Sequence, residues 1–183
     1  MNVVVFGGSF NPPHIAHVLG VAWVLATSDI DLVLVVPAFR HPFAKSLAPY
    51  ADRVKMCELA MAWLPRVEVS RLEEELGGES RTLRTIEHLA KTHPDYKLRL
   101  LIGSDVLLES PKWFRFDAIA ELAPPLVLGR AGFDATPQAP PTLLPGVSST
   151  EVRALMAEGR WDELEPLVPR AVVAYAKERG LYR

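Results

Sequence analysis

The sequence predicts an α/β fold in which helices cover both faces of a parallel sheet. Short runs of apolar residues alternate with stretches of helical periodicity along roughly the first 130 residues, an order typical of parallel sheets. These runs are apolar throughout, as expected for strands buried on both faces. Hydrophobic residues make up 49% and charged residues 23% of the 183-residue chain, which fits a packed globular protein. The predicted fold class is therefore a Rossmann-like doubly wound parallel sheet with a helical C-terminal segment.

The first strand is predicted over Val3 to Phe6, where β-branched residues lead into the Gly7-Gly8 pair. Apolar runs and helical periodicity predict the next elements: a helix over 14–26, a strand at 31–37, a helix over 50–64, a strand at 67–70 and a helix over 82–93. Pro37 ends the strand at 31–37.

A strand at 96–105 ends in a polar turn and is followed by a predicted helix over 111–122. Ser110 would be the N-cap of this helix and Pro111 its first residue. One more strand is predicted at 125–130.

The rest of the chain divides into a connection and a helical segment. Residues 131–147 contain four prolines, which indicates a surface connection, and residues 148–183 have helical patterns. The length favours one domain over 1–183, with a core at about 1–130.

Charge and cysteine content narrow the classes of function. A net charge of −2 gives no basic field, so we expect no binding to nucleic acid. No apolar run is long enough to span a bilayer, so we expect no membrane partner. Cys57 has no second cysteine to pair with, and its apolar neighbours indicate a buried, inert thiol. With no secretory leader pattern at the N-terminus, we expect a cytoplasmic location.

The stretch GGSFNPPHIAH, residues 7–17, comes directly after the first strand, where open parallel sheets bind ligands. It lacks the G-K-[ST] of a P-loop and the G-x-G-x-x-G of a dinucleotide fold. His14 and His17 share one face at the start of a helix, where free N–H groups favour an anion. The pair therefore indicates phosphate binding. Simple packing is the alternative, and a metal site is less favoured because no third ligand is evident.

A second candidate phosphate motif is VSSTEVR, residues 147–153. Ser148 and Glu151 have the spacing of a capping box, which by itself explains the sequence as a helix start. The same start offers three successive hydroxyls, free N–H groups and Arg153 one turn later, which suits polyphosphate oxygens. Both interpretations stay open for this motif alone.

Together the two motifs resemble those of the nucleotidyltransferase superfamily, (T/H)-x-x-H near the first strand and I-S-S-T-x-x-R near the C-terminus. The segments SRTLRTI, IGSDVLLESPKWFRFDAI and VPRAVVAYAKERGLYR resemble those of bacterial nicotinate-nucleotide adenylyltransferases, in the same order. The resemblance implies transfer of the adenylyl group of ATP to nicotinate mononucleotide, giving nicotinate adenine dinucleotide and pyrophosphate. It also implies Mg²⁺ bound with ATP. Two alternatives stay open. One is transfer to another phosphorylated acceptor, such as nicotinamide mononucleotide or phosphopantetheine, and the other is a non-catalytic nucleotide sensor. A homo-oligomer is possible.

The resemblance also implies roles for individual residues. His14 and His17 would contact the ATP phosphates, with His17 at the α-phosphate. The backbone of the glycine turn would line the site, and Asp105 would accept from ribose hydroxyls, although Asp105 could equally be the N-cap of a helix. The residues expected at ATP are Gly7, Gly8, Ser9, Phe10, Gly103, Asp105, Ser148, Ser149, Thr150 and Arg153.

On the acceptor side, Trp113 would stack on the pyridine ring, and the backbone at Thr82, Leu83 and Phe114 would receive its carboxylate. Without the resemblance Trp113 would be interpreted as a packing residue, and Trp23 and Trp63 keep that interpretation.

Two segments depart from the family pattern. The family's S-Y-T is Ser80-Arg81-Thr82 here. This change removes an aromatic residue on the acceptor side and adds a cation, so it concerns the identity of the acceptor more than the reaction. In place of a P-P-H-K-like segment, the chain has a positive cluster that could serve the same phosphates, and Lys45 is its candidate catalytic cation. A solvated loop of charges is the alternative interpretation. The members of the cluster are Arg40, His41, Lys45 and Arg53.

Overall fold

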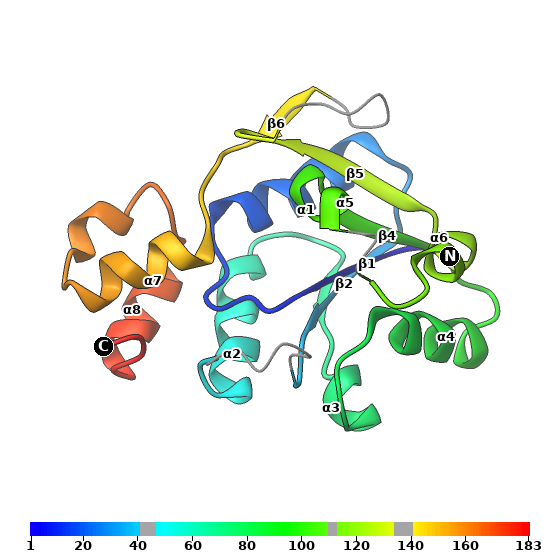
Figure 1. Ribbon diagram of the computed structural model, residues 1–183, viewed down its shortest axis with the longest axis horizontal. Coiled ribbons are helices and arrows are strands. Elements are labelled where there is room, and N and C mark those ends of the chain that lie inside the picture. The colour runs from blue at the N-terminus through cyan, green and yellow to red at the C-terminus, as the bar shows by residue number, and fades with distance from the viewer. Residues whose placement is uncertain (41–46, 110–112, 134–140) are drawn as a thin grey trace.

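The computed structural model describes residues 1–40, 47–109, 113–133 and 141–183. Strands and helices alternate along most of this chain, as predicted (Figure 1). In order the elements are β1 (Asn2–Gly8), α1 (Ile15–Thr27), β2 (Leu32–Pro37), α2 (Tyr50–Met61), β3 (Val67–Val69), α3 (Leu72–Leu76), α4 (Thr82–Thr92), β4 (Lys97–Gly103), α5 (Ser104–Glu109), α6 (Phe116–Leu122), β5 (Pro125–Arg130), β6 (Thr142–Leu144), α7 (Ser149–Ala157), the 3-10 helix η2 (Trp161–Leu164) and α8 (Arg170–Glu178).

The strands form one six-stranded sheet with the order β3-β2-β1-β4-β5-β6, and every pairing is parallel. The order reverses between β1 and β4. In open α/β sheets this switch point, at the carboxyl ends of the strands, is where ligands bind. The predicted doubly wound fold class is confirmed.

Alternate residues of the central strands face two separate cores, one on each side of the sheet. Val4 and Val33 pack with α1, α2 and the C-terminal helices, whereas Val3 and Leu34 pack with α3, α4 and α6. All four valine and leucine side chains are nearly inaccessible to solvent. Burial on both faces explains why these strands are apolar throughout.

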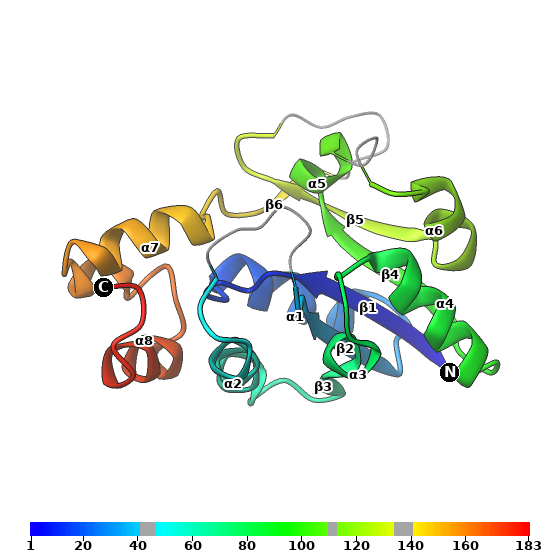
Figure 2. The same ribbon diagram turned by 60° about the horizontal axis from the view of Figure 1, so that its bottom comes forward.

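The C-terminal helical segment lies at one end of the molecule, beside α2 (Figures 1 and 2). Tyr175 of α8 donates a 2.7 Å hydrogen bond to the Asp52 carboxylate of α2, and Arg179 Nε donates to the same oxygen. These contacts join the C-terminal segment to α2, which packs on the sheet. Among the described residues, no helix is both long and apolar enough to cross a membrane.

Several sequence predictions were wrong in detail. The helix predicted over 111–122 begins only at Phe116, because Arg115 before it adopts a left-handed conformation (φ 52°); Ser110 and Pro111 lie outside the described residues. A separate helix, α5, follows β4 directly, so Asp105 lies inside its first turn and is not an N-cap. The connection at 131–147 contributes β6, and Trp63 is 68% exposed beyond the end of α2 rather than packed.

Candidate active site

A cavity of about 890 Å³ opens at the switch point of the sheet. It is lined by the ends of three neighbouring strands: Gly7 and Gly8 of β1, Gly103 of β4 and Arg130 of β5. The structure gathers most of the predicted site residues around it. Those that line it are Gly7, Gly8, Ser9, His14, His17, Thr82, Leu83, Gly103, Asp105, Trp113 and Phe114.

The two histidines stack on each other at the start of α1. Their ring centroids are 3.7 Å apart, and the backbone N–H of His14 donates to Nδ1 of His17 over 3.1 Å. Because Nδ1 of His17 accepts this bond, the proton of the neutral His17 ring is on Nε2. Phe10 lies beneath the pair, buried and with positive φ, its ring 5.0 Å from that of His17. Phe10 therefore supports the histidines from the core and does not line the cavity.

Both histidines are neutral near pH 7. Burial, together with the positive charge of Arg130, lowers the pKa of His14 to about 3. Burial likewise holds the pKa of His17 well below its usual value, assisted by His14 and Arg130. The site therefore offers imidazole N–H donors, not imidazolium charges.

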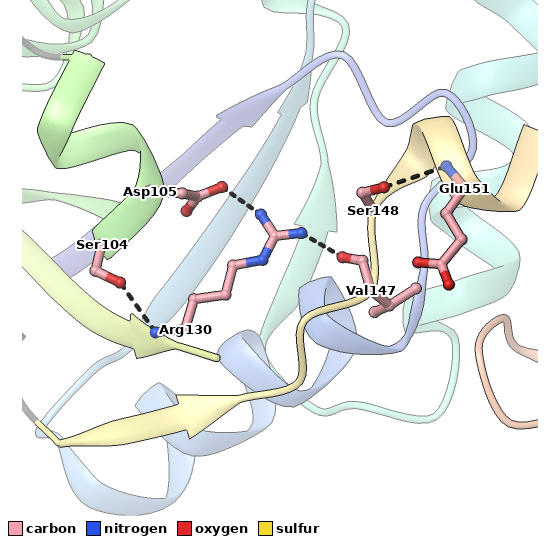
Figure 3. A network of polar contacts seen from close by, with 6 residues as sticks. All are labelled: Ser104, Asp105, Arg130, Val147, Ser148 and Glu151. Atoms are coloured by element: carbon pink, nitrogen blue, oxygen red, sulfur yellow. Dashed lines mark hydrogen bonds and ion pairs between the residues drawn. The ribbon is translucent and has the colours of Figure 1, made fainter. Parts of the chain in front are cut away.

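Arg130 is a site residue that no sequence motif indicated. Its guanidinium forms an ion pair with Asp105, donates to the carbonyl of Val147 and is largely buried (Figure 3). Its backbone N–H donates to Ser104 Oγ over 3.0 Å. A charged residue at the carboxyl end of an apolar parallel strand is the signal that could have identified it.

Two buried polar atoms beside the cavity have no hydrogen-bond partner among the described residues: His14 Nδ1 and Arg130 Nε. Buried polar groups in native proteins are nearly always paired. Both residues line the cavity, which agrees with a polar ligand binding there.

Gly103 is required by the position of Asp105. A Cβ built at Gly103 would collide with Oδ1 of Asp105, so only glycine lets this carboxylate fold back over the end of β4. The ion pair with Arg130 depends on that conformation.

Comparison with known proteins identifies the family. The chain matches the cytidylyltransferase-like family over residues 5–155. It is 46% identical to a protein named as a nicotinate-nucleotide adenylyltransferase in Anaeromyxobacter sp. (strain K), over 99% of this chain and 96% of that protein. A protein of the same name in Myxococcus xanthus is 42% identical, over 100% of this chain and 95% of its own length. The chain belongs to the nicotinate-nucleotide adenylyltransferase family.

Solved structures agree on the fold. The nicotinic acid mononucleotide adenylyltransferase of Plasmodium falciparum, complexed with NaAD, superposes with a TM-score of 0.85 at 19% identity, over 99% of this chain and 97% of that chain. The same enzyme complexed with APC gives 0.84 at 20% identity, over 99% and 96% of the two chains. Membership in the family makes the chain a nucleotidyltransferase, as the two motifs predicted.

In this family member, the loop between β1 and α1 is held by hydrogen bonds to its carbonyl oxygens. Arg53 Nη1 donates to Ser9 O over 2.9 Å, and Arg153 Nη1 donates to Asn11 O over 2.8 Å. Ser149 Oγ donates to Pro12 O over 2.9 Å. The two signature motifs, more than 130 residues apart, are thus directly bonded to each other.

The side chain of Asn11 adds a second set of ties to this loop. Its Oδ1 accepts from the backbone N–H of Ala48 and from the Tyr182 hydroxyl, both over 2.9 Å. The C-terminal end of the chain therefore helps to fix the glycine turn, a role the sequence did not reveal.

The start of α7 is built as its motif predicts. Ser148 is the N-cap, and its Oγ accepts from the backbone N–H of Glu151 over 3.1 Å (Figure 3). Thr150 Oγ1 accepts from Arg153 Nη2. The four predicted phosphate ligands of this motif, Ser148, Ser149, Thr150 and Arg153, stand beside the cavity and are not among the residues that line it. Arg130, through Val147, connects the cavity to them.

The predicted acceptor residues also line the cavity. Thr82 is the first residue of α4, and the Arg81 guanidinium lies 5.0 Å from the centroid of the Phe114 ring. Trp113 packs edge-on against Phe116 and still lines the cavity.

The predicted positive cluster is not a single surface. Arg53 is 1% exposed and donates to Ser9 O and Ala48 O, so it is a buried structural clamp and not part of a solvated loop of charges. Arg40 is exposed, and its backbone exchanges hydrogen bonds with Ser80. His41 and Lys45 lie outside the described residues. Cys57 is buried, which raises the pKa of its thiol, as predicted.

Proposed function

We propose that this protein transfers the adenylyl group of ATP to nicotinate mononucleotide, releasing pyrophosphate. The observation that carries the proposal is one cavity lined both by two neutral histidines at the switch point and by two aromatic residues, Trp113 and Phe114. The first set suits a phosphate and the second a pyridine ring.

Catalysis of this reaction requires mainly that the protein align the two substrates and stabilise the charge on the α-phosphate. A phosphate oxygen of the acceptor attacks the α-phosphorus of ATP, and the bond to the bridging oxygen of the β-phosphate breaks. The attacking oxygen is already anionic at pH 7, so no general base is needed. Nε2–H of His17 donates to a nonbridging α-phosphate oxygen, whose charge grows in the transition state. His14 supports it from the stacked position.

The leaving pyrophosphate would be held by the start of α7. Ser148, Ser149 and Thr150 offer hydroxyls beside free N–H groups, and Arg153 supplies charge. Support comes from the bonds of Ser149 and Arg153 to the glycine loop, which fix α7 relative to the histidines. Lys45 completes our proposed set of catalytic cations.

The adenosine would lie over the backbone of Gly7, Gly8 and Gly103, which lines the cavity at the ends of β1 and β4. Asp105 would accept from the ribose hydroxyls while it stays paired with Arg130, since a carboxylate has lone pairs for several donors.

Magnesium would enter as part of the MgATP substrate. The described residues contain no group of three histidine, cysteine or acidic side chains arranged to hold a metal ion. Phosphate oxygens and water are sufficient ligands for Mg²⁺, which keeps several of its waters in such sites. The ion would share the charge of the leaving pyrophosphate.

Measurement of pyrophosphate release tests the proposal. The purified protein is incubated with Mg²⁺, ATP or CTP, and one of three acceptors: nicotinate mononucleotide, nicotinamide mononucleotide or phosphopantetheine. We expect turnover with ATP and nicotinate mononucleotide far above every other pair. A different preferred acceptor would replace the substrate assignment, and no turnover with any pair would leave a nucleotide sensor as the better interpretation.

A further inference from the structure

We propose that Arg81 is a specificity-determining residue, which favours an acceptor with a carboxylate on its ring over one with a neutral amide. The inference rests on the proposed function and assigns a role to the residue at which this chain departs from the S-Y-T pattern. It concerns the choice between nicotinate and nicotinamide mononucleotide.

Arg81 lies on the acceptor wall of the cavity. It immediately precedes Thr82, the first residue of α4, and its side chain lines the cavity with its guanidinium over the Phe114 ring. Phe114 is 57% exposed. A pyridine ring placed against Trp113 and Phe114 would therefore carry its substituent close to this cation.

The other charges around the cavity make Arg81 the available cation on this side. Among the described lining residues the only other cation is Arg130, which is paired with Asp105 beside the histidines. Besides Asp105, the acidic residues among the described cavity lining are Glu73 and Glu79. Glu73 already accepts from the Phe39 N–H and the Thr85 hydroxyl.

Glu79 is the present partner of Arg81. Arg81 Nε and Nη2 donate to a single oxygen, Glu79 Oε2, over 3.0 and 2.8 Å. The two side chains are 47% and 44% exposed, so the pair contributes little and can rearrange easily. The fork of five N–H donors in a guanidinium can serve a second carboxylate at the same time.

Arg81 thus acts on a ligand carboxylate in two ways. It attracts that carboxylate directly, and it neutralises Glu79, which would otherwise repel it. A neutral amide experiences neither effect to the same degree. Loss of Arg81 should therefore penalise nicotinate mononucleotide selectively.

The experiment compares kcat/KM for the two acceptors in the wild type, R81Q, R81K and the double variant R81Q/E79Q. We expect R81Q to lower kcat/KM for nicotinate mononucleotide at least tenfold, mostly through KM, and to change the value for nicotinamide mononucleotide less than threefold. R81K should keep most of the preference because it keeps the charge. The double variant should recover part of the loss because the repelling carboxylate is gone.

Arg71 provides a matched control. It is 48% exposed, pairs with Glu74 and lies 5.6 Å from the Tyr50 ring centroid, yet it is outside the cavity lining. R71Q should leave the acceptor ratio unchanged. An R81Q protein with an unchanged ratio would overturn this inference while the proposed function stands, whereas a wild type inactive on both acceptors would overturn the two together.

Discussion

Asp105 and Arg130 face each other across the carboxyl ends of β4 and β5 and form an ion pair inside the cavity (Figure 3). The side chains are 21% and 16% exposed, so the pair is only weakly screened. The same guanidinium reaches the carbonyl of Val147, the residue before the N-cap of α7. One arginine therefore connects the proposed ribose site with the proposed pyrophosphate site.

Replacement of Arg130 by methionine should weaken both sites. The change keeps the aliphatic stem but leaves the Asp105 carboxylate and the Val147 carbonyl without their donor, which costs about 1–3 kcal/mol of stability. We expect the KM for ATP to rise at least tenfold. Urea denaturation and initial-rate kinetics measure the two effects; an unchanged KM would mean that the guanidinium does not order the ATP site. Arg99, which donates to the carbonyls of Pro124 and Pro125 away from the cavity lining, is a suitable control as R99M.

His17→Ala should lower kcat by about two orders of magnitude or more, in the range seen when a transition-state hydrogen-bond donor is removed. KM for ATP should change much less, because the lost bond strengthens only as charge develops. Steady-state kinetics with circular dichroism as a folding check gives the answer. Exposed His93 supplies the control, H93A, and an H17A enzyme with near wild-type kcat would contradict our role for His17.

The depressed histidine pKa values predict a loss of stability in weak acid. The unfolded chain protonates His14 and His17 near pH 6.5, whereas the folded pKa of His14 is about 3 and that of His17 is also well below 6.5. Stability is therefore complete above about pH 6.5 and falls as pH drops toward the folded values, by about 1.4 kcal/mol per pH unit for each histidine. Urea titrations between pH 5 and 6.5 should show a shallower slope in H14N than in the wild type. Equal slopes would show that His14 is not buried in its neutral form.

Gly103→Ala should act through Asp105. The new Cβ would collide with Asp105 Oδ1 and drive the carboxylate away from Arg130. We expect the KM for ATP to rise about as much as in D105N, and the double variant G103A/D105N to be little worse than either single one, because residues that act through one interaction are not additive. If the effects of the two changes on the KM for ATP were additive, Gly103 and Asp105 would act independently, and this interpretation of Gly103 would be wrong.

The sequence predicted the sheet and the signature motifs because both are local patterns. Apolar runs such as Val3 to Phe6 mark buried strands whatever surrounds them, and Ser148 with Glu151 marks a helix start from spacing alone. The same reasoning failed at residues 111–122, where helical periodicity continued through Arg115 although the backbone there is left-handed. Periodicity reports which face is apolar, not where a helix begins.

The supporting contacts of the site could not be predicted, because they join residues far apart in the chain. Arg53 looked like a member of an exposed positive loop, and only the fold shows that it is buried against the carbonyls of Ser9 and Ala48. Tyr182 donates to Asn11 across 171 positions. Such hydrogen bonds produce no recognisable spacing in the sequence. Short motifs therefore reveal the residues expected to contact substrate more readily than the distant residues that position them.

Arg53→Met tests whether the glycine turn depends on this clamp. Two carbonyl oxygens would lose their donor inside the protein, which should lower the free energy of unfolding by about 2–4 kcal/mol. Since Ser9 lines the cavity, the KM for ATP should rise as well. R53K should be intermediate, because one ammonium group cannot reproduce the geometry of the guanidinium fork. Arg170, whose side chain is 87% exposed, gives the control R170M, which should stay within about 0.5 kcal/mol of the wild type. If R53M were as stable as R170M, the Ser9 and Ala48 carbonyls would not need their buried donor, and the rigidity of the turn would have to come from Arg153, Ser149 and the hydrogen bonds of the Asn11 side chain.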